Sequence, residues 1–252
     1  MAPKKYTGPL AVFWLIMLVG SALNLTALRL AFKHLMSKLG LCEAPTHREF
    51  LESLVRFLEP EIASRDEPPN PINADGSVEG CIVLCNHVNW ADFVLDIAFI
   101  PKGVFVSRDL LWYVFFPASV IRDVLFADMV YFKRKKTVDA AAKAALYDTV
   151  AAKCKEGRSV VVYAEGTRNN TGEKMKLKVG LIKLAYERNI PLYVSMVSNK
   201  YGVVDEKNLT VTFGAKVANK MSPLVLPAKF DTFDAFLAAT QAAWDDVWDK
   251  TR

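Results

Sequence analysis

The sequence predicts an α/β fold in which a mainly parallel sheet is flanked by helices. After Gly80, short apolar runs of strand length alternate with longer stretches of helical length, which is typical of helices packed on a mainly parallel sheet. Before residue 60 the chain instead carries a long apolar segment, which predicts a membrane-associated helical hairpin at the N-terminus.

The first segment, Leu10 to Ala31, contains no charged residue between Leu10 and Leu28. A helix of this length reaches across a hydrocarbon core of ~30 Å at a rise of 1.5 Å per residue. A signal peptide and a buried core helix are alternatives. We favour a helix that spans the membrane or is half-embedded in it. Basic residues are more numerous after the apolar run than before it, which favours a cytosolic position for the rest of the chain.

A second helix is predicted from Thr46, because Thr46 and Glu49 form a capping box. Its broad apolar stripe suits packing on the core or a position in the membrane interface equally well. Residues 1–60 are therefore predicted to be hydrophobic membrane-anchoring helices. Residues 61–79 are rich in Pro, Asn, Asp and Gly and are predicted to be a linker, and residues 80–252 are predicted to be the α/β domain.

Six strands and four helices are predicted within residues 80–252. The strands are Cys81–Cys85, Val104–Ser107, Met129–Phe132, Ser159–Tyr163, Leu192–Val197 and Leu209–Phe213, and the helices are Phe93–Ile100, Thr137–Glu156, Lys178–Arg188 and Phe233–Lys250. The apolar stretch Asp109 to Ile121 is too short to span a membrane and is interrupted by Pro117. It is either a core helix or an apolar lip that dips into a bilayer or lines an acyl channel.

The charge balance limits the kind of partner. The chain has 32 Lys and Arg against 27 Asp and Glu, a net charge of +5. This modest excess fits anionic phosphate ligands or an anionic membrane surface better than a nucleic acid, so no nucleic-acid partner is expected. The four Cys show no CxxC spacing and are predicted to be reduced. The His residues have no metal-ligand spacing, so no metal site is expected.

His87 and Asp92 follow the first predicted strand of the α/β domain. On a continuous helix, five residues would turn their side chains apart by roughly 140°, so they meet only if a helix begins between them. Asn89 suits the N-cap, which makes Asp92 the third helical residue of a capping box. Asp92 would then hold one imidazole nitrogen while the other removes a proton, as in a catalytic triad. A satisfied polar pair is the alternative.

No GxSxG nucleophile motif is present, so the nucleophile is expected to be a hydroxyl of the substrate. Two further clusters follow predicted strands. Glu165-Gly166-Thr167-Arg168 offers a sharp turn, a hydroxyl and a planar guanidinium suited to phosphate. Lys133-Arg134-Lys135-Lys136 places four cations where a helix would begin. Cations are unfavourable at a helix N-terminus, so this cluster indicates anion binding rather than a solvated surface.

The order of these motifs, NHxxxxD, then a strand ending in Arg134, then EGTR, resembles the glycerolipid acyltransferase family, which includes 1-acylglycerol-3-phosphate acyltransferases. The resemblance covers roughly residues 80 to 200, together with hydrophobic N-terminal helices. It implies that His87 and Asp92 are the catalytic pair. The substrate-binding residues that it implies are Arg134, Glu165, Gly166, Thr167, Arg168 and Lys178.

The chain departs from the family pattern in three places. Tyr163-Ala164 stands where Phe-Pro usually precedes EGTR, Asp128 stands where a Gly is usual, and Val194 replaces a second Pro in the last block. These departures keep every reacting group and bear on which acceptor is preferred.

The activity implied by the resemblance is transfer of an acyl group from acyl-CoA, or acyl carrier protein, to the hydroxyl of a lysophospholipid. The first expectation is lysophosphatidic acid to phosphatidic acid, with acyl-CoA as co-substrate and no cofactor. The alternatives are a transacylase or an enzyme that remodels another lysophospholipid, and a catalytically silent lipid-binding protein. The protein is expected at a membrane, the endoplasmic reticulum in a eukaryote or the inner membrane in a bacterium, with its catalytic domain in the cytosol.

Overall fold

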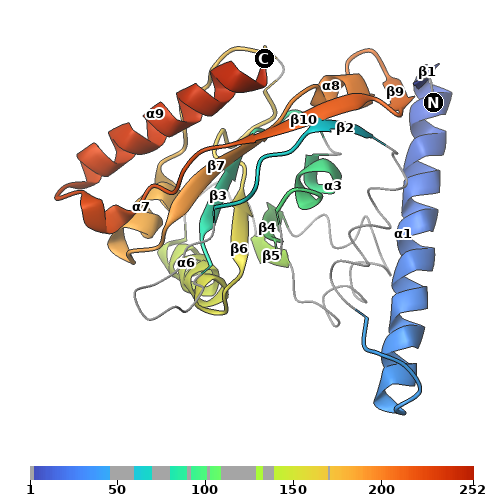
Figure 1. Cartoon of the computed structure of the whole chain (residues 1–252), viewed down its shortest axis with the longest axis horizontal. Coiled ribbons are helices and arrows are strands. Elements are labelled where there is room, and N and C mark those ends of the chain that lie inside the picture. The colour runs from blue at the N-terminus through green and yellow to red at the C-terminus, as the bar shows by residue number, and fades with distance from the viewer. Residues whose placement is uncertain are drawn as a thin grey trace.

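The computed structural model describes residues 3–45, 60–69, 80–89, 92–100, 103–108, 129–132, 139–169 and 171–252. Among these residues, seven strands form a central sheet in the order β2-β10-β7-β3-β6-β4-β5 (Figure 1). Their bounds are Glu61–Ser64 (β2), Ile82–Cys85 (β3), Gly103–Arg108 (β4), Met129–Phe132 (β5), Ser159–Val162 (β6), Leu192–Val197 (β7) and Lys216–Met221 (β10).

The sheet is mainly parallel, as the sequence predicts. Strands β3 to β7 run parallel to one another, and β10 is antiparallel to β7. At the far edge β2 pairs in parallel with β10. The predicted linker over 61–79 therefore begins with an edge strand of the sheet. The signal was weak because Glu61–Ser64 is short and polar, and its pairing partner lies about 150 residues later, so neighbouring residues cannot reveal it.

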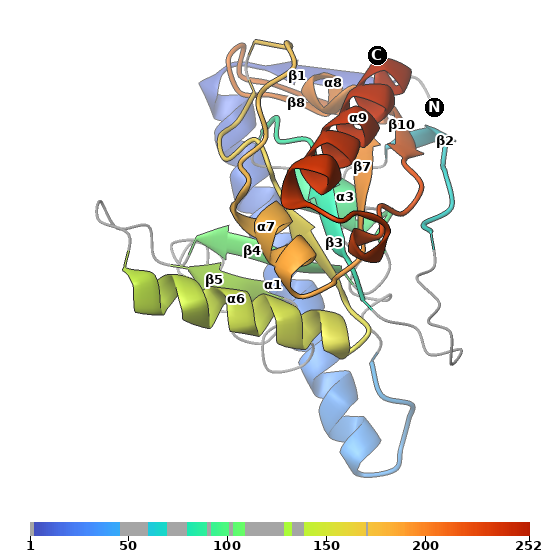
Figure 2. The ribbon, with the colours of Figure 1, turned by 90° about the vertical axis from the view of Figure 1, so that its left-hand side faces the viewer.

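Helices cover both faces of the sheet. Alternate residues of β3 pack on opposite sides: Val83 and Cys85 belong to one apolar cluster, and Ile82 and Leu84 to the other. The second cluster includes α6 (Ala140–Lys155), α7 (Gly180–Glu187) and α9 (Phe233–Thr251), and the first includes α1 (Pro9–Lys38) and α3 (Asp92–Ile97). Figure 2 shows α6, α7 and α9 in front of the sheet and α1 behind it.

A second, smaller sheet joins the N-terminus to the body. Its order is β1-β9-β8, formed by Lys4–Thr7, Thr210–Phe213 and Val204–Asp205, and its pairings are antiparallel. The remaining elements are α8 (Lys200–Val203) and a 3-10 turn at Pro227–Lys229. The strand predicted at Leu209–Phe213 thus exists, but it starts at Thr210 and lies outside the main sheet. Leu209 itself has a φ of 49°, which no strand residue adopts.

The helix boundaries show what local signals miss. Helix α6 begins at Ala140, not Thr137, and Asp139 is its N-cap because the carboxylate accepts from the backbone N–H groups of Ala141 and Ala142. Helix α7 begins at Gly180, not Lys178, and helix α3 ends at Ile97. The segments predicted as a second N-terminal helix from Thr46 and as an apolar lip over 109–121 lie outside the described residues.

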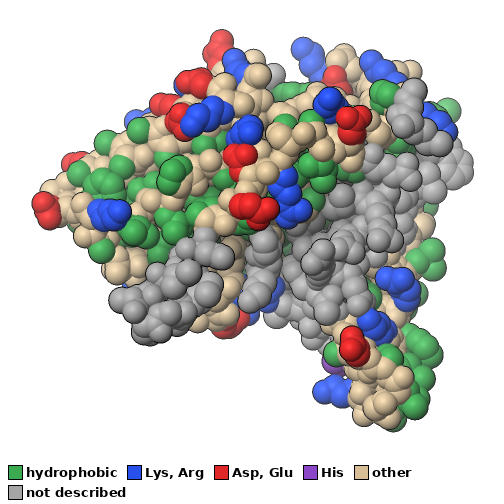
Figure 3. Space-filling view, viewed as in Figure 1, with side chains coloured by type: hydrophobic (Ala, Val, Ile, Leu, Met, Phe, Trp, Pro, Cys, Tyr) green, Lys and Arg blue, Asp and Glu red, His purple; other side chains and the backbone are tan. Residues whose placement is uncertain are grey.

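Helix α1 runs for 30 residues along one side of the molecule (Figure 1). Ala27 and Leu30 are buried against the body. Large apolar side chains of the same helix face outward, which Figure 3 shows along the outer edge and at its projecting end; they are Leu10, Phe13, Met17, Leu25, Leu28, Phe32 and Leu35. No helix within the described residues combines the length and apolar character needed to cross a membrane.

Candidate active site

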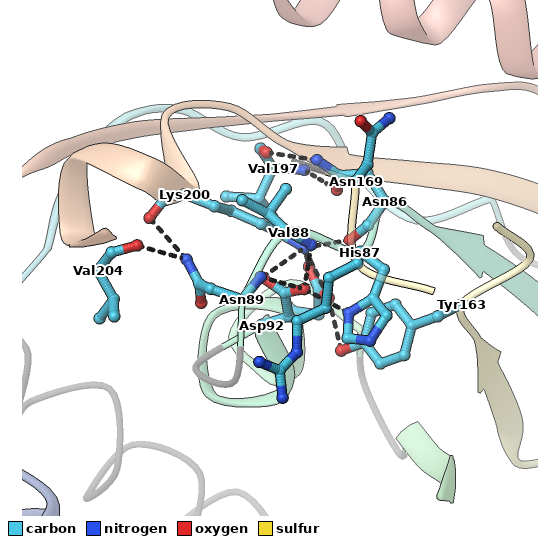
Figure 4. Close-up of polar contacts among 12 residues, drawn as sticks. Asn86, His87, Val88, Asn89, Asp92, Tyr163, Asn169, Val197, Lys200 and Val204 are labelled. Carbon is cyan, nitrogen blue, oxygen red and sulfur yellow. Dashed lines mark hydrogen bonds and ion pairs between the residues drawn. The ribbon is translucent and has the colours of Figure 1, made fainter. Parts of the chain in front are cut away.

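The candidate site lies where three neighbouring parallel strands end. His87 follows β3, Glu165 follows β6 and Lys200 follows β7, and these strands are adjacent in the sheet. The carboxyl ends of parallel strands meet at one edge, which is where α/β folds bind ligands. Figure 4 shows the residues gathered there around the start of α3.

His87 and Asp92 form the contact that their spacing predicts. The Nδ1 atom of His87 lies 2.7 Å from Oδ2 of Asp92. The same carboxylate accepts from the backbone N–H of Val88 and, at 3.1 Å, from that of Asn89, which is the carboxylate half of the expected capping box. Asp92 is 1% exposed and His87 is 24% exposed, so the carboxylate is sheltered while the imidazole reaches the surface.

Two asparagines hold the His87 loop against the next strand. The side chain of Asn86 donates to the carbonyl of Val197 and accepts from its N–H, at 3.1 and 3.2 Å. The Asn89 amide donates to the carbonyls of Lys200 and Val204, at 3.1 and 2.7 Å. A buried side chain that makes such bonds has one position, so the loop that carries His87 is fixed by the end of β7 and by α8.

Lys200 and Asp96 form a buried pair behind the catalytic candidates. Lys200 is 2% exposed, and its Nζ lies 2.8 Å from Oδ1 of Asp96. Asp96 also accepts from the hydroxyl of Tyr163, whose ring stacks on the His87 ring at 4.4 Å between centroids. None of these three residues was predicted from the sequence to belong to the site. The available signal was Asp96 itself, a carboxylate one helical turn after Asp92 inside the apolar run Phe93–Ile100.

Glu165 is buried beside this cluster. Its side chain is fully buried, and within the described residues neither carboxylate oxygen makes a hydrogen bond of good geometry. Burial raises the pKa of Glu165 to about 7, against the opposing effect of Lys200. An unsatisfied buried carboxylate at a sheet edge is suited to hold a hydroxyl or a cation of a ligand.

The turn after Glu165 is exposed and sharply bent. Gly166 has a φ of 72°, and a Cβ at this position would lie 2.9 Å from Cγ of Lys178. Thr167 and Arg168 are exposed at the surface. Lys178 belongs to the following loop, where its N–H donates to the carbonyl of Ala164 at 2.7 Å. Glycine therefore permits both the turn and the close approach of Lys178.

The structure brings most of the predicted site together. The backbone N–H of Asn169 donates to the carbonyl of His87 at 2.7 Å, so the Glu165–Arg168 turn lies against the His87 loop. Arg168 is paired, because its Nη1 lies 2.5 Å from Oε2 of Glu206. Arg134 lies outside the described residues.

A cavity of about 400 Å³ opens beside the His87 loop. It is lined by Val88, Tyr201 and residues Asp205, Glu206, Lys207 and Asn208. Val88 adjoins His87, and Glu206 connects the cavity to Arg168. Among the described residues, no group of three or more His, Cys, Asp or Glu side chains is arranged to hold a metal ion. The arrangement is suited to proton transfer next to an anion-binding turn.

Comparisons with known proteins identify the family of the chain. The sequence model of the acyltransferase family matches residues 67–198, or 132 of the 252 residues. A 1-acyl-sn-glycerol-3-phosphate acyltransferase of Cocos nucifera is 24% identical over 164 residues, which are 62% of this chain and 50% of that protein. The chain thus spans about half the length of the curated relative it matches.

The fold is shared with a solved structure. The crystal structure of the 1-acyl-sn-glycerophosphate (LPA) acyltransferase from Thermotoga maritima has a TM-score of 0.61 and 16% identity, covering 96% of this chain and 98% of that one. These matches confirm the family expected from the sequence. By its motifs, its fold and these matches, the chain belongs to the acyltransferase family.

Proposed function

We propose that the protein transfers a fatty acyl group from acyl-CoA to the free hydroxyl of lysophosphatidic acid, giving phosphatidic acid. The observation that carries this proposal is the 2.7 Å contact between His87 Nδ1 and Asp92 Oδ2 at the carboxyl edge of the sheet. Since Nδ1 faces Asp92, Nε2 is the nitrogen that takes the proton of the acceptor hydroxyl. The names of the relatives support the acceptor class.

The reaction needs no protein nucleophile. His87 takes the hydroxyl proton while the oxygen attacks the thioester carbonyl, forming a new C–O bond and a tetrahedral intermediate. The intermediate collapses with cleavage of the C–S bond, and the departing CoA sulfur takes the proton back from His87. Asp92 orients the ring and stabilises its protonated form, as the carboxylate of a catalytic triad does.

The acceptor phosphate is proposed to bind at the exposed turn after β6. Arg168 offers a planar fork for phosphate oxygens, with the Thr167 hydroxyl beside it and Lys178 against the turn. Gly166 keeps the turn open to a ligand. Glu165 is proposed to hold a glycerol hydroxyl, and Arg134 is proposed as a further phosphate ligand. Because Arg168 is paired with Glu206, the phosphate must replace that carboxylate.

The protein is proposed to work at a membrane. Exposed apolar side chains on α1 are unfavourable in water over such a length, and a lipid surface would cover them. Attachment of this helix to a bilayer would hold the sheet edge near lipid acceptors. The proposed location is the endoplasmic reticulum in a eukaryote or the inner membrane in a bacterium, with the catalytic domain on the cytosolic side.

Substitution of His87 by Ala tests the role of the base. We expect kcat to fall by roughly 10²–10⁴-fold, because general-base assistance is lost, while the melting temperature stays unchanged. The assay is release of CoA thiol from purified protein with oleoyl-CoA and lysophosphatidic acid in detergent micelles. Asp92→Asn is the companion variant and should lose activity through the orientation of the ring.

If the His87→Ala variant keeps activity close to that of the unaltered protein, His87 is not the general base. Three further assay arms separate the alternatives. Lysophosphatidylcholine and glycerol 3-phosphate as acceptors test the headgroup, and a phospholipid donor without CoA tests transacylation. Turnover in none of the arms by a folded protein would favour a silent lipid-binding protein.

A further inference from the structure

The His87–Asp92 pair lies against a buried charge cluster, which we define as Asp92, Asp96 and Lys200. Asp92 and Asp96 are one turn apart on α3, and both side chains are 1% exposed. Two carboxylates buried this close repel each other, and without a counter-charge one of them would take up a proton. Lys200 is the cation that allows both to stay ionised.

The position of Lys200 divides its charge between the two carboxylates. Its Nζ lies 2.8 and 2.9 Å from the two carboxylate oxygens of Asp96, and 3.8 Å from Oδ1 of Asp92. It also donates to the carbonyl of Asn86 at 2.7 Å. Burial alone would lower the pKa of Lys200, but Asp92 and Asp96 hold it above its ordinary value. The ammonium group therefore stays charged next to Asp92 while that carboxylate binds His87.

A second connection runs from Asp96 to the face of the imidazole. The hydroxyl of Tyr163 donates to Oδ2 of Asp96 at 2.9 Å. The Tyr163 ring then lies 4.4 Å from the His87 ring, with 21° between their planes (Figure 4). Asp96 thus fixes the aromatic surface on which His87 rests, while Asp92 fixes the edge of the same ring.

The formal charges of the cluster can be counted for the two states of the proposed proton transfer. Two carboxylates and one ammonium sum to −1 when His87 is neutral. They sum to 0 together with His87 once it has taken the proton of the acceptor. A buried site is most stable when its charges balance, so the cluster lowers the energy of the state in which the imidazolium exists.

We propose that Lys200 and Asp96 are positioning residues for the base. They hold Asp92 and Tyr163 around His87, and they leave the cluster with one uncompensated negative charge until His87 accepts a proton. The inference rests on the proposed role of His87 as general base. Lys200 and Asp96 lie outside the family motifs. The proposal gives both residues a part in the reaction, although neither touches the substrate.

The protonation states of other titratable groups near the cluster affect the interpretation of the experiment. Burial raises the pKa values of Cys85 and Tyr163 well above their ordinary range, and burial also raises that of Tyr201, so all three stay neutral near pH 7. Burial also raises the pKa of Asp96 to about 6 and that of Glu165 to about 7. Because Asp96 and Glu165 both titrate in the range of interest, the protonation of His87 must be observed directly and not inferred from activity.

The experiment is an NMR titration of His87 in protein labelled with ¹⁵N-histidine. The chain has three histidines, so comparison with His87→Gln assigns the signal. In Asp96→Asn one negative charge is lost while the amide oxygen still accepts from Tyr163. We expect the titration midpoint of His87 to fall by roughly one pH unit. In the double variant Asp96→Asn/Lys200→Met the cluster again carries −1, and the midpoint should return to that of the unaltered protein.

The kinetic readout separates positioning from binding. Asp96→Asn should lower kcat by roughly 10–100-fold, because the imidazolium is less favoured and the ring less well held, with the KM for the acceptor changed less than about twofold. Asp66→Asn is the matched control. Asp66 pairs with Lys220 on β10 at 3.2 Å and also accepts from the backbone N–H of Met221, away from the cluster, so neither His87 nor kcat should respond.

Two results would overturn the proposal: a His87 midpoint that is unchanged or raised in Asp96→Asn, or a double variant that does not restore it. In Lys200→Met alone, Asp96 is expected to take up a proton, so the midpoint should stay at or above that of the unaltered protein. A lower value would also count against the proposal. If Lys200→Met does not fold, the other two variants decide. An active His87→Ala variant would instead remove the proposed base, and the titration would still report on the cluster.

Discussion

The carboxylate of Glu206 is paired with the guanidinium of Arg168, which is proposed to bind the acceptor phosphate. The Arg168–Glu206 pair is partly exposed, at 46% and 31%, so breaking it requires little free energy. The phosphate of an incoming acceptor must nevertheless compete with a carboxylate that is already in place. At the residue scale this makes Glu206 a determinant of acceptor affinity that lies outside the EGTR turn.

Substitution of Glu206 by Gln should therefore improve binding of the acceptor. We expect the KM for lysophosphatidic acid to fall by roughly 2–5-fold, because an exposed ion pair contributes up to ~1 kcal/mol, with kcat unchanged. Arg168→Ala should raise the KM by roughly 10–100-fold through loss of a charge-assisted bond to phosphate. In the Arg168→Ala background the Glu206→Gln substitution should have no further effect, and an equal gain there would show that Glu206 acts by another route.

Glu165 gives the stability of the protein a specific pH dependence. Its pKa rises from the model-compound value of 4.5 to about 7 in the folded state, mainly through burial. Between these two values the folded state binds more protons than the unfolded chain, so ionisation of Glu165 destabilises the fold as pH rises. The unfavourable contribution is absent below pH 4.5 and complete above pH 7.

The Glu165→Gln variant should remove this dependence. Its unfolding free energy relative to the unaltered protein should increase between pH 5 and pH 8, by on the order of 2 kcal/mol. Thermal unfolding followed by circular dichroism at the two pH values measures the difference. The variant should be less active at both, because Glu165 is proposed to hold the acceptor hydroxyl. A stability difference that is the same at pH 5 and pH 8 would contradict the assignment.

At the scale of the element, α1 both packs against the body and presents exposed apolar side chains. Its sequence alone does not show which residues do which. Ala27 and Leu30 anchor it to the core, and the strand before it pairs with β9, so the helix is fixed to the body. Its outward apolar residues then form a rigid ridge, not a flexible tail. In the proposed membrane-bound state, a ridge that is fixed to the body would set the orientation of the sheet edge at the lipid surface.

Two glutamates on this ridge should weaken membrane attachment. In Phe32→Glu/Leu35→Glu, both apolar side chains that are lost are more than half exposed, so folding should be unaffected. We expect binding to phosphatidylcholine vesicles, measured by co-sedimentation, to fall at least ~10-fold. The matched control is Ala238→Glu/Ala242→Glu, which adds the same charge to exposed positions of α9. Equal loss in both variants would indicate a general charge effect instead of a ridge.

At the scale of the whole molecule, the sequence was sufficient where a signal is local. Strands β3 to β7 are mostly apolar runs in the sequence, so the parallel sheet and the edge that carries His87 followed from pattern alone. Strands β1, β2, β8 and β10 were missed. They are short and partly polar, and what stabilises them is pairing with distant segments, such as Lys4–Thr7 with β9, about 200 residues later.

The candidate site divides in the same way. His87, Asp92 and the Glu165–Arg168 turn were predictable because each motif is contiguous in sequence. Lys200 and Tyr163 were not, because a lysine in isolation suggests a solvated surface and a tyrosine after a strand suggests packing. Only the fold shows that Lys200 is buried between two carboxylates and that Tyr163 lies under the imidazole.

The asparagine contacts of the His87 loop have a consequence for how the protein is made. Asn86 bonds to Val197 and Asn89 to Lys200, and each pair is separated by 111 positions. A ribosome adds roughly 5–20 residues per second, so the loop stays unanchored for several seconds after His87 has been synthesised. The nascent chain therefore carries the complete NHxxxxD motif long before it holds an organised base. The loop that carries the proposed base can be anchored only once α8 has been made, so the proposed site is completed during synthesis of the last quarter of the chain.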